Sequence, residues 1–252
     1  MSLKNKIIIV TGAASGMGYA TVKKLVDIGA IVYACDVSSK GLENVTSYSK
    51  NIKTIKCDIS SSSDCNEMIQ EVVSAQGKLD GIVNFAGVIK RTGILECTDE
   101  EFDFVMRINV NGCFYLTRAA AKAKLVNGKG SIVNVSSIWS SIGASNVLAY
   151  CASKGAVSQI TRSAALDLAG SGIRVNEIRP GETNTAMLAS EREGTFGRED
   201  LEKKLKEIAL TIPKKRLAEP SEMADAAIFL LSDASSYVQG SHITVDGGYT
   251  AQ

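Results

Sequence analysis

Short apolar segments alternate with helical patterns along the whole chain. Seven segments are rich in β-branched residues and short enough to be single strands: 6–11, 31–35, 52–57, 79–85, 132–135, 173–178 and 242–245. Between them, apolar residues recur at intervals of three and four, the spacing of one helix face. Because parallel strands need right-handed helical crossovers, the alternation predicts an α/β fold: a doubly wound, parallel, seven-stranded sheet with helices on both faces.

The alternation predicts a single domain over residues 1–252, because no internal repeat, linker or low-complexity segment interrupts it. The principal helices are expected at about 102–126, 150–169 and 221–231. One long polar segment, from about 186 to 215, departs from this rhythm. Because long connections in compact domains are often functional, we expect this segment to form a lid over a substrate.

The overall charge excludes two kinds of partner. The chain has 28 basic and 27 acidic residues, so it lacks the electrostatic footprint of a nucleic-acid-binding protein or of a protein that binds an anionic membrane. No stretch approaches the ~18 consecutive apolar residues that a spanning helix needs. We therefore expect a small-molecule substrate, no nucleic acid and no membrane.

Cysteine and histidine usage narrows the chemistry further. The six cysteines show no CxxC spacing, which indicates reduced thiols and a cytoplasmic location. The only histidine, His242, falls in the last predicted strand and is interpreted as an ordinary strand residue. A single histidine argues against a Ser-His-Asp triad and against a multi-histidine metal site, and we predict no metal.

Tyr150 and Lys154 form a candidate acid/base pair. In a helix over 150–169 they lie at i and i+4, one above the other on one face. A phenol ionises near pH ~10, and a neighbouring positive charge favours the phenolate and lowers the pKa. We therefore expect Tyr150 to exchange protons as a general acid/base, with Lys154 as the group that tunes it.

A glycine-rich turn between the first strand and the first helix predicts a phosphate site. Gly12, Ser15, Gly16, Met17 and Gly18 fall where the backbone must turn sharply and where N–H groups at a helix N-terminus would hold a pyrophosphate.

The acid that ends the second strand indicates which dinucleotide binds. Asp36 follows Gly16 by twenty residues, where a carboxylate would accept hydrogen bonds from a ribose 2′-hydroxyl. An acid at this position repels a 2′-phosphate, and neither 13–15 nor Val37 supplies a compensating basic residue. NAD is therefore predicted over NADP. Asp58 ends the third strand and either reaches the adenine amine or serves as a helix N-terminal acid.

With these residues the chain resembles a short-chain dehydrogenase/reductase of the compact, single-domain, Rossmann-like kind. The resemblance covers essentially the whole chain and rests on the joint order of its motifs. They are Thr11-Gly12-x-x-x-Gly16-x-Gly18, Asp58-Ile59, Asn84-Phe85-Ala86-Gly87, Asn109-Val110-Asn111-Gly112, Ser137, Tyr150-x-x-x-Lys154, Asn176 with Pro180-Gly181, and Val245-Asp246-Gly247-Gly248.

The resemblance implies a role for each catalytic position. Tyr150 would exchange a proton with the alcohol or carbonyl oxygen while hydride moves, and Lys154 would lower its pKa and hold the nicotinamide ribose. Ser137 would hydrogen-bond the reacting oxygen, and Asn109 would hold a water in a proton relay. The implied cofactor-binding residues are Gly12, Ser15, Gly16, Met17, Gly18, Asp36, Val37, Asp58, Ile59, Asn84, Ala86, Gly87, Tyr150, Lys154, Pro180, Gly181, Thr183 and Thr185.

Two positions depart from the family pattern. Phe85 stands where the family commonly has a second asparagine, which puts a sheet-stabilising hydrogen bond in doubt. Thr183 replaces a β-branched apolar residue, but a backbone contact from this position to the nicotinamide carboxamide does not depend on the side chain.

The substrate pocket is expected between 138–149, the loop 88–91 and the lid. Its candidate contacts are Ser137, Trp139, Asn146, Tyr150, Glu182 and Met187. Apolar residues such as Ile138, Ile142 and Val147 suit a hydroxysteroid or another bulky secondary alcohol, whereas Lys90, Arg91 and Asn146 suit a carboxylate or polyol. Both substrate classes stay open.

The resemblance leaves three functions to weigh. The first is an NAD-dependent secondary-alcohol dehydrogenase or ketone reductase. The second is a 3-oxoacyl-carrier-protein reductase, against which the near-neutral charge, the lid and Asp36 all argue. The third is a catalytically silent nucleotide-sensing module, which the presence of all four catalytic positions disfavours. The resemblance also implies a homodimer or homotetramer, assembled through the helices near 100–126 and 150–169, with a small-residue face at 119–123.

Overall fold

The computed structural model describes residues 2–123, 128–190 and 198–252. Seven parallel strands form one sheet in the order β3-β2-β1-β4-β5-β6-β7. The strands are β1 (Ile7–Thr11), β2 (Ile31–Asp36), β3 (Ile52–Lys56), β4 (Gly81–Asn84), β5 (Gly130–Val135), β6 (Ile173–Pro180) and β7 (His242–Val245). The predicted doubly wound sheet is confirmed. The strand order reverses between β1 and β4, which is where such sheets bind ligands.

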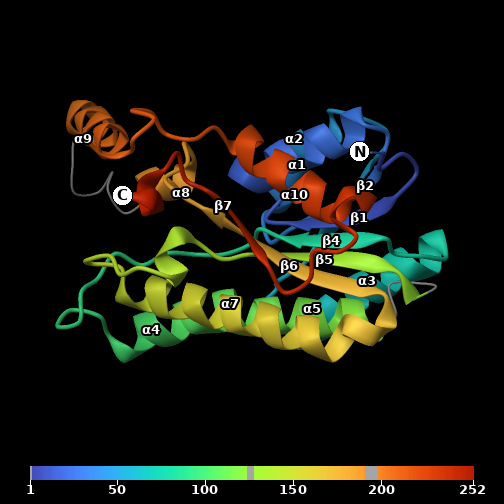
Figure 1. The fold of residues 1–252 in the computed structure, drawn as a ribbon. Coiled ribbons are helices and arrows are strands. Elements are labelled where there is room, and N and C mark those ends of the chain that lie inside the picture. Colours follow the sequence, from blue (N-terminus) through green and yellow to red (C-terminus); the bar gives the residue numbers. More distant parts are fainter. Residues whose placement is uncertain (1, 124–127, 191–197) are drawn as a thin grey trace.

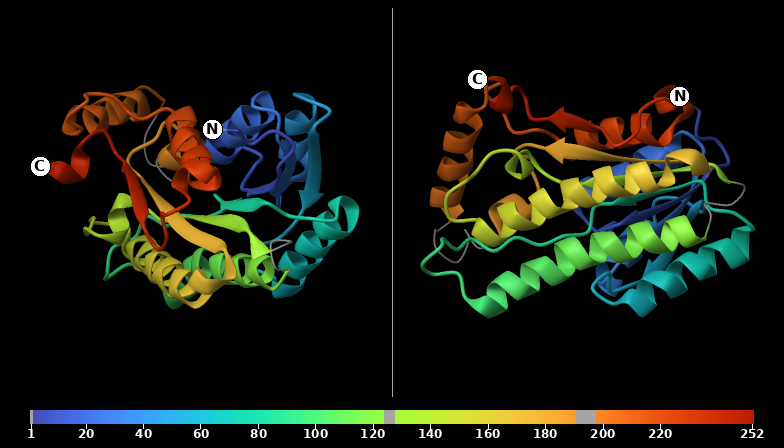
Figure 2. Two further views of the ribbon diagram at one scale, coloured as in Figure 1. Left: turned by 45° about the vertical axis from the view of Figure 1, so that its right-hand side comes forward. Right: turned by 60° about the horizontal axis from the view of Figure 1, so that its bottom comes forward.

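Helices cover both faces of the sheet (Figures 1 and 2). One face carries α1 (Gly16–Asp27), α2 (Ser39–Thr46) and α10 (Pro220–Leu231), and the other carries α3 (Ser62–Gln76), α4 (Asp99–Met106), α5 (Gly112–Lys122) and α7 (Leu148–Leu168). Each face has its own buried apolar cluster. Because the central strands are buried on both faces, they are mostly apolar rather than alternating, and β1 is buried at all five positions.

The helix predicted at about 102–126 changes its winding in the middle. Between α4 and α5 lies a π-helical turn, η1 (Arg107–Asn111), and residues 124–127 lie outside the described part of the chain. Such turns insert a residue into the helical register and are common at functional sites. The turn therefore determines which side chains of Arg107–Asn111 face the carboxyl ends of the strands.

The polar segment predicted as a lid contains two helices. They are α8 (Ala186–Ala189) and α9 (Arg198–Thr211), while 191–197 lie outside the described residues. Both helices lie at the same end of the molecule as the C-terminus (Figure 1). Four 3₁₀ turns complete the fold: η2 (Ile138–Ser140), η3 (Ala169–Ser171), η4 (Asp233–Ser235) and η5 (Tyr249–Ala251).

None of the helices in the described part of the chain is long and apolar enough to cross a membrane.

Candidate active site

Two adjoining cavities open at the carboxyl ends of the strands, beside the point where the strand order reverses. The larger has a volume of about 440 Å³ and the smaller a volume of about 240 Å³. Their linings share Met17, Phe85, Gly87, Thr185 and Met187. A ligand in the larger cavity can therefore reach a second ligand in the smaller one.

The glycine-rich turn is built for close backbone approach. Gly12 has φ +64°, and a Cβ there would come within 2.8 Å of the Ala86 nitrogen. A Cβ on Gly18 would overlap the carbonyl oxygen of Gly12. Ser15 is the N-cap of α1 and makes no side-chain cap hydrogen bond. The turn thus presents the start of α1 to the larger cavity as a cradle that fits a pyrophosphate.

Asp36 is fastened to the same turn. One carboxylate oxygen accepts a hydrogen bond from the Ala14 N–H at 3.1 Å, and the other accepts from the Ser38 N–H at 2.9 Å. The residue lines the larger cavity together with Val37, Asp58 and Ile59, as the sequence predicted for a nucleotide site. Two bound oxygens hold the carboxylate in one orientation, and its remaining lone pairs suit the hydroxyls of a ribose.

The predicted catalytic residues converge on the smaller cavity. Ser137 follows β5, and Tyr150 and Lys154 project from the first two turns of α7. The Lys154 ammonium lies 5.5 Å from the centre of the Tyr150 ring and donates a hydrogen bond to the Val135 carbonyl at 2.8 Å. Phenol, hydroxyl and ammonium therefore face one space, in which a single reacting oxygen can meet the first two.

The pKa of Tyr150 shifts in the direction opposite to that expected from the sequence. Burial raises the pKa of Tyr150 to about 12, with Glu182 adding to the rise and the hydrogen bond with Ser137 opposing it. Burial also lowers the pKa of Lys154 to about 8. Desolvation outweighs the lowering influence of Ser137 and Arg91 on this pKa, so the phenol is held in its protonated form at neutral pH.

Asn109 supports the site through its side chain. Its Oδ1 accepts from the Val88 N–H at 2.8 Å, and its Nδ2 donates to the Val88 carbonyl and to Ser153 Oγ. A Cβ on Gly87 would lie 3.1 Å from that Oδ1 and 3.6 Å from Lys154 Nζ. Asn109 therefore joins η1, α7 and the loop after β4 beside Lys154. Its holding of a water stays a prediction.

Two residues predicted to contact ligand make other contacts. The Asn84 side chain donates to Asn134 Oδ1 at 2.7 Å within the sheet, and Asn134 donates in turn to Thr161 of α7. Asn146 adopts φ +59° and is not part of the lining of the smaller cavity. Phe85, where the family commonly has asparagine, lines both cavities instead.

Most of the other predicted contacts line the smaller cavity, and their contact with a ligand stays a prediction. Trp139, Glu182, Met187, Pro180, Gly181, Thr183 and Thr185 line the smaller cavity. Of the apolar residues expected around the substrate, Val147 is in this lining, whereas Ile138 is buried and Ile142 is exposed at the surface. The Thr183 hydroxyl donates to the Gly181 carbonyl at 3.0 Å, which leaves its backbone as the group available to a ligand.

Sequence reasoning missed several lining residues. Phe104, Arg107 and Ile108 reach the larger cavity from α4 and η1, and Cys35 reaches it from β2. Ile89, Ala144, Ser145 and Leu188 line the smaller one and lie within the segments from which the substrate pocket is expected. No motif marks Arg107 or Ile108, because the π-helical turn brings them into place.

Arg91 bonds the start of the segment that is predicted to be a lid. Its Nε donates to the Ser190 carbonyl at 3.1 Å, and its Nη2 donates to the carbonyls of Met187 and Leu188, each at 3.3 Å. These carbonyls lie at the end of α8, where helix carbonyls lack partners of their own. Arg91 lines the smaller cavity as well, so it combines a lid contact with a positive charge at the site.

In the described residues 2–123, 128–190 and 198–252, no three histidine, cysteine or acidic residues are grouped as a metal site would require.

Known proteins resemble this chain over almost its whole length. A family model described as enoyl-(acyl carrier protein) reductase matches residues 12–250. A 2-(R)-hydroxypropyl-CoM dehydrogenase from Xanthobacter autotrophicus is 36% identical, covering 98% of this chain and 99% of its own. A cyclopentanol dehydrogenase from Comamonas testosteroni is 34% identical over 99% of this chain and 98% of its own. The crystal structure of levodione reductase superposes with a TM-score of 0.94 at 32% identity, covering 98% of each chain.

Proposed function

We propose that this protein uses NAD(H) and that Tyr150 is its general acid/base. The chain belongs to the short-chain dehydrogenase/reductase family. It is an oxidoreductase of secondary alcohols and ketones that uses a nicotinamide dinucleotide. One observation carries the proposal. Ser137, Tyr150 and Lys154 line one cavity, and that cavity adjoins the one built around the glycine-rich turn and Asp36.

The residues of the two cavities have different roles. The dinucleotide, when bound, supplies the acceptor or donor of hydride. Gly12, Gly16 and Gly18 allow its pyrophosphate to approach the start of α1, and Asp36 receives the ribose hydroxyls. Thr183 and Thr185 line the smaller cavity, and the nicotinamide carboxamide would be held by the backbone of Thr183 and the hydroxyl of Thr185.

Proton transfer is assigned to Tyr150. With a pKa near 12 the phenol carries its proton at neutral pH and donates it to a carbonyl oxygen during reduction. The Ser137 hydroxyl stabilises the negative charge that develops on that oxygen. Lys154, with a pKa near 8, is mostly charged at pH 7 and stabilises the phenolate after the proton has left.

The preference for NAD rests on the orientation of Asp36. A 2′-phosphate would bring two further negative charges to a carboxylate that two backbone N–H groups hold in place. Arg107 is the basic residue of this lining and comes from η1, so the choice between the two dinucleotides is best measured directly.

The size of the smaller cavity favours a compact secondary alcohol. Its volume of about 240 Å³ lies below the ~300–1,000 Å³ usual for drug-sized ligands, and part of it belongs to the catalytic residues. Trp139, Val147 and Leu188 give it an apolar wall, which suits a small ring alcohol better than a hydroxysteroid. Arg91 and Glu182 supply the charges that a polyol or a carboxylate-bearing substrate would use.

A substrate panel tests the proposal. Purified protein is mixed with NAD or NADP and with cyclopentanol, a hydroxysteroid, a polyol and a hydroxy acid, and the absorbance of reduced nicotinamide is followed. We expect turnover with NAD and the compact alcohol. Tight NADH binding without turnover of any alcohol or ketone would instead support the nucleotide-sensing module.

A 3-oxoacyl-carrier-protein reductase is the second candidate, because the matching family model is described by an acyl-carrier-protein activity. Reduction of a 3-oxoacyl thioester with NADPH, at a kcat/KM well above that for cyclopentanol with NAD, would favour it.

We further propose a cytoplasmic homodimer or homotetramer that assembles through α4, α5 and α7. Phe114 of α5 and Leu166 of α7 are large apolar residues that are 42% and 79% exposed. The small-residue face expected at 119–123 does not serve this purpose, since Ala119 and Ala120 are buried in the cluster that includes α3. Sizing of the purified protein, with Leu166→Glu as the comparison, tests the assembly.

A further inference from the structure

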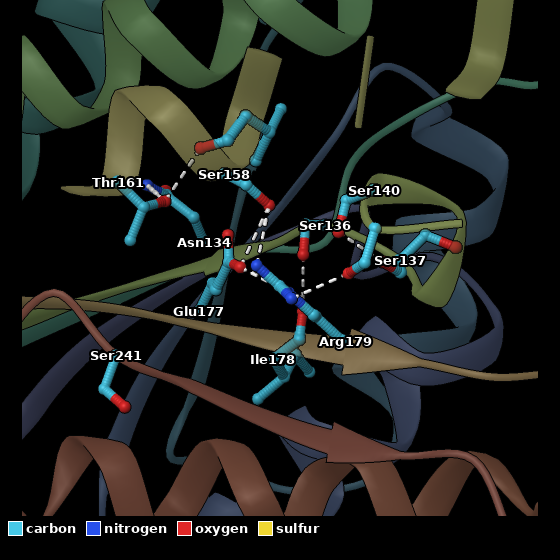
Figure 3. Close-up of polar contacts among 12 residues, drawn as sticks. Asn134, Ser136, Ser137, Ser140, Ser158, Thr161, Glu177, Ile178, Arg179 and Ser241 are labelled. Atoms are coloured by element: carbon cyan, nitrogen blue, oxygen red, sulfur yellow. Dashed lines mark hydrogen bonds and ion pairs between the residues drawn. The ribbon is translucent and has the colours of Figure 1, made fainter. Parts of the chain in front are cut away.

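A buried ion pair lies on β6 behind the active site (Figure 3). Arg179 Nε donates to Glu177 Oε1 at 2.7 Å, and the two residues are 8% and 2% exposed. Being two positions apart on a strand, they project from the same face of the sheet, toward α7. There the Ser158 hydroxyl donates to the same carboxylate oxygen at 2.9 Å. The pair is thus joined to the helix that carries Tyr150 and Lys154.

The arginine also reaches out of this buried cluster. Its Nη1 donates to Ser141 Oγ at 2.8 Å, and Ser141 is exposed at the start of the loop that follows η2. A single guanidinium therefore contacts β6, α7 and the segment after β5. The planar guanidinium presents five N–H donors in fixed directions, so one arginine side chain can hold all three partners.

Ser141 belongs to a turn that carries two residues of the active site. The Ser141 N–H donates to the Ile138 carbonyl at 3.1 Å, and Ser140 Oγ donates to the Ser137 carbonyl at 2.6 Å. The Trp139 N–H donates to Ser137 Oγ at 3.2 Å. These bonds connect residues 137–141 into one unit, so a displacement of Ser141 also displaces Ser137 and Trp139. Both of these residues line the smaller cavity.

Stability alone does not account for a buried ion pair here. Removing two charges from water costs several kcal/mol per ion, and well-packed apolar residues of similar volume often do as well or better. The same face of β6 is apolar at Ile173 and Val175, where the strand packs in the cluster with α3 and α5. On this face of β6 the charges occur only at the end of the strand that adjoins Ser137.

We propose that the Glu177–Arg179 pair is a positioning device, in which Arg179 holds the turn 137–141 at a set distance from α7 and so aligns Ser137 and Trp139 with Tyr150. Ser158 follows Lys154 by one helical turn and Tyr150 by two, so it lies on the same side of α7 as both. A misplacement of 1 Å between reacting groups can cost about 100-fold in rate. The inference rests on the role proposed above for Ser137.

Ser141→Ala tests this device with little risk to folding, because Ser141 is exposed. Loss of the charge-assisted bond frees the turn, and we expect kcat/KM for the alcohol to fall about tenfold while the Kd for NADH stays within about twofold. Trp139 is the only tryptophan, so its fluorescence reports on the turn without any substrate. Acrylamide quenching of this fluorescence should increase.

Ser158→Ala separates the two ties of the device. It removes the bond that ties the pair to α7 but leaves the bond from Arg179 to Ser141. The turn stays bonded to Arg179 but is no longer held at its distance from α7, so we expect unchanged Trp139 quenching with a lower kcat/KM for the alcohol. Arg179→Lys keeps the charge without the fork and should reproduce the increased quenching of Ser141→Ala.

Wild-type quenching in Ser141→Ala, or a wild-type kcat/KM for an alcohol that the enzyme turns over, would overturn the proposal. Quenching and NADH binding need no turnover. A wild-type protein inactive on every alcohol would therefore contradict the proposed function alone, and quenching would still decide on the device.

Discussion

The rings of Trp139 and Tyr249 meet edge to face, with their centres 5.6 Å apart and their planes at 82°. Trp139 is part of the wall of the smaller cavity, and Tyr249 comes from η5 near the C-terminus. Asp246 shapes this end of the chain, since its carboxylate accepts hydrogen bonds from the N–H groups of Gly248 and Thr250 at 2.9 and 2.8 Å. Residues 246–250 thus support Trp139 in the wall of the smaller cavity.

Tyr249→Ala removes this support. An edge-to-face pair contributes about 0.5–1.5 kcal/mol beyond the area it buries, so we expect KM for a compact ring alcohol to rise about three- to tenfold. Tyr249→Phe keeps the ring and should behave like wild type. Steady-state kinetics with saturating NAD measures the effect, and equal KM values in all three proteins would show that Tyr249 does not support the wall.

Asp36→Ala should change the choice of dinucleotide. The substitution removes the acceptor for the ribose hydroxyls and the charge that repels a 2′-phosphate, so the ratio of kcat/KM for NAD to that for NADP should fall by about 100-fold. Asp36→Asn keeps an acceptor without the charge, so its ratio should lie between those of wild type and Asp36→Ala. A ratio unaffected by Asp36→Ala would assign the preference to another residue.

Lys154→Met should stabilise the protein while damaging activity. Burial lowers the pKa of Lys154 from its usual 10.5 to about 8. Between pH 8 and 10.5 the unfolded chain binds a proton that the folded protein does not, so wild-type stability gains with rising pH in this window. Below pH 8 the charged ammonium of Lys154 stays buried in the folded protein, and its full desolvation cost lowers the free energy of unfolding.

The methionine variant avoids that cost, although the Val135 carbonyl loses its donor. At pH 7 we expect the free energy of unfolding to rise by about 1–3 kcal/mol, and the gain should shrink as the pH approaches 10. Urea unfolding at pH 7 and pH 9.5 measures both effects. A variant less stable than wild type at pH 7 would mean that Lys154 is better solvated than its burial indicates.

The sequence predicts the sheet and the nucleotide turn well because both depend on local chemistry. Buried parallel strands are mostly apolar, and a glycine is required where a Cβ would strike the backbone, as at Gly12. Ser137, Tyr150 and Lys154 were found because a helix and a strand end carry them in a recognisable order. Their presence in one cavity follows from the sheet order.

Other features depend on contacts that no sequence pattern reveals. Arg107 and Ile108 enter the larger cavity because a π-helical turn shifts the register of the helix. The pKa of Tyr150 rises because desolvation outweighs a nearby charge, a balance that only the packed site determines. Asn84 was predicted to contact the dinucleotide, but its side chain bonds Asn134 across the sheet.

The most direct test of Tyr150 as the general acid/base is the turnover of Tyr150→Phe, measured together with its Kd for NADH. The substitution keeps the ring and removes the proton donor, so kcat should fall by about 10²–10⁴-fold while the Kd for NADH stays within a few-fold of wild type. A variant with near-normal kcat and unchanged NADH binding would contradict the assignment of proton transfer to Tyr150.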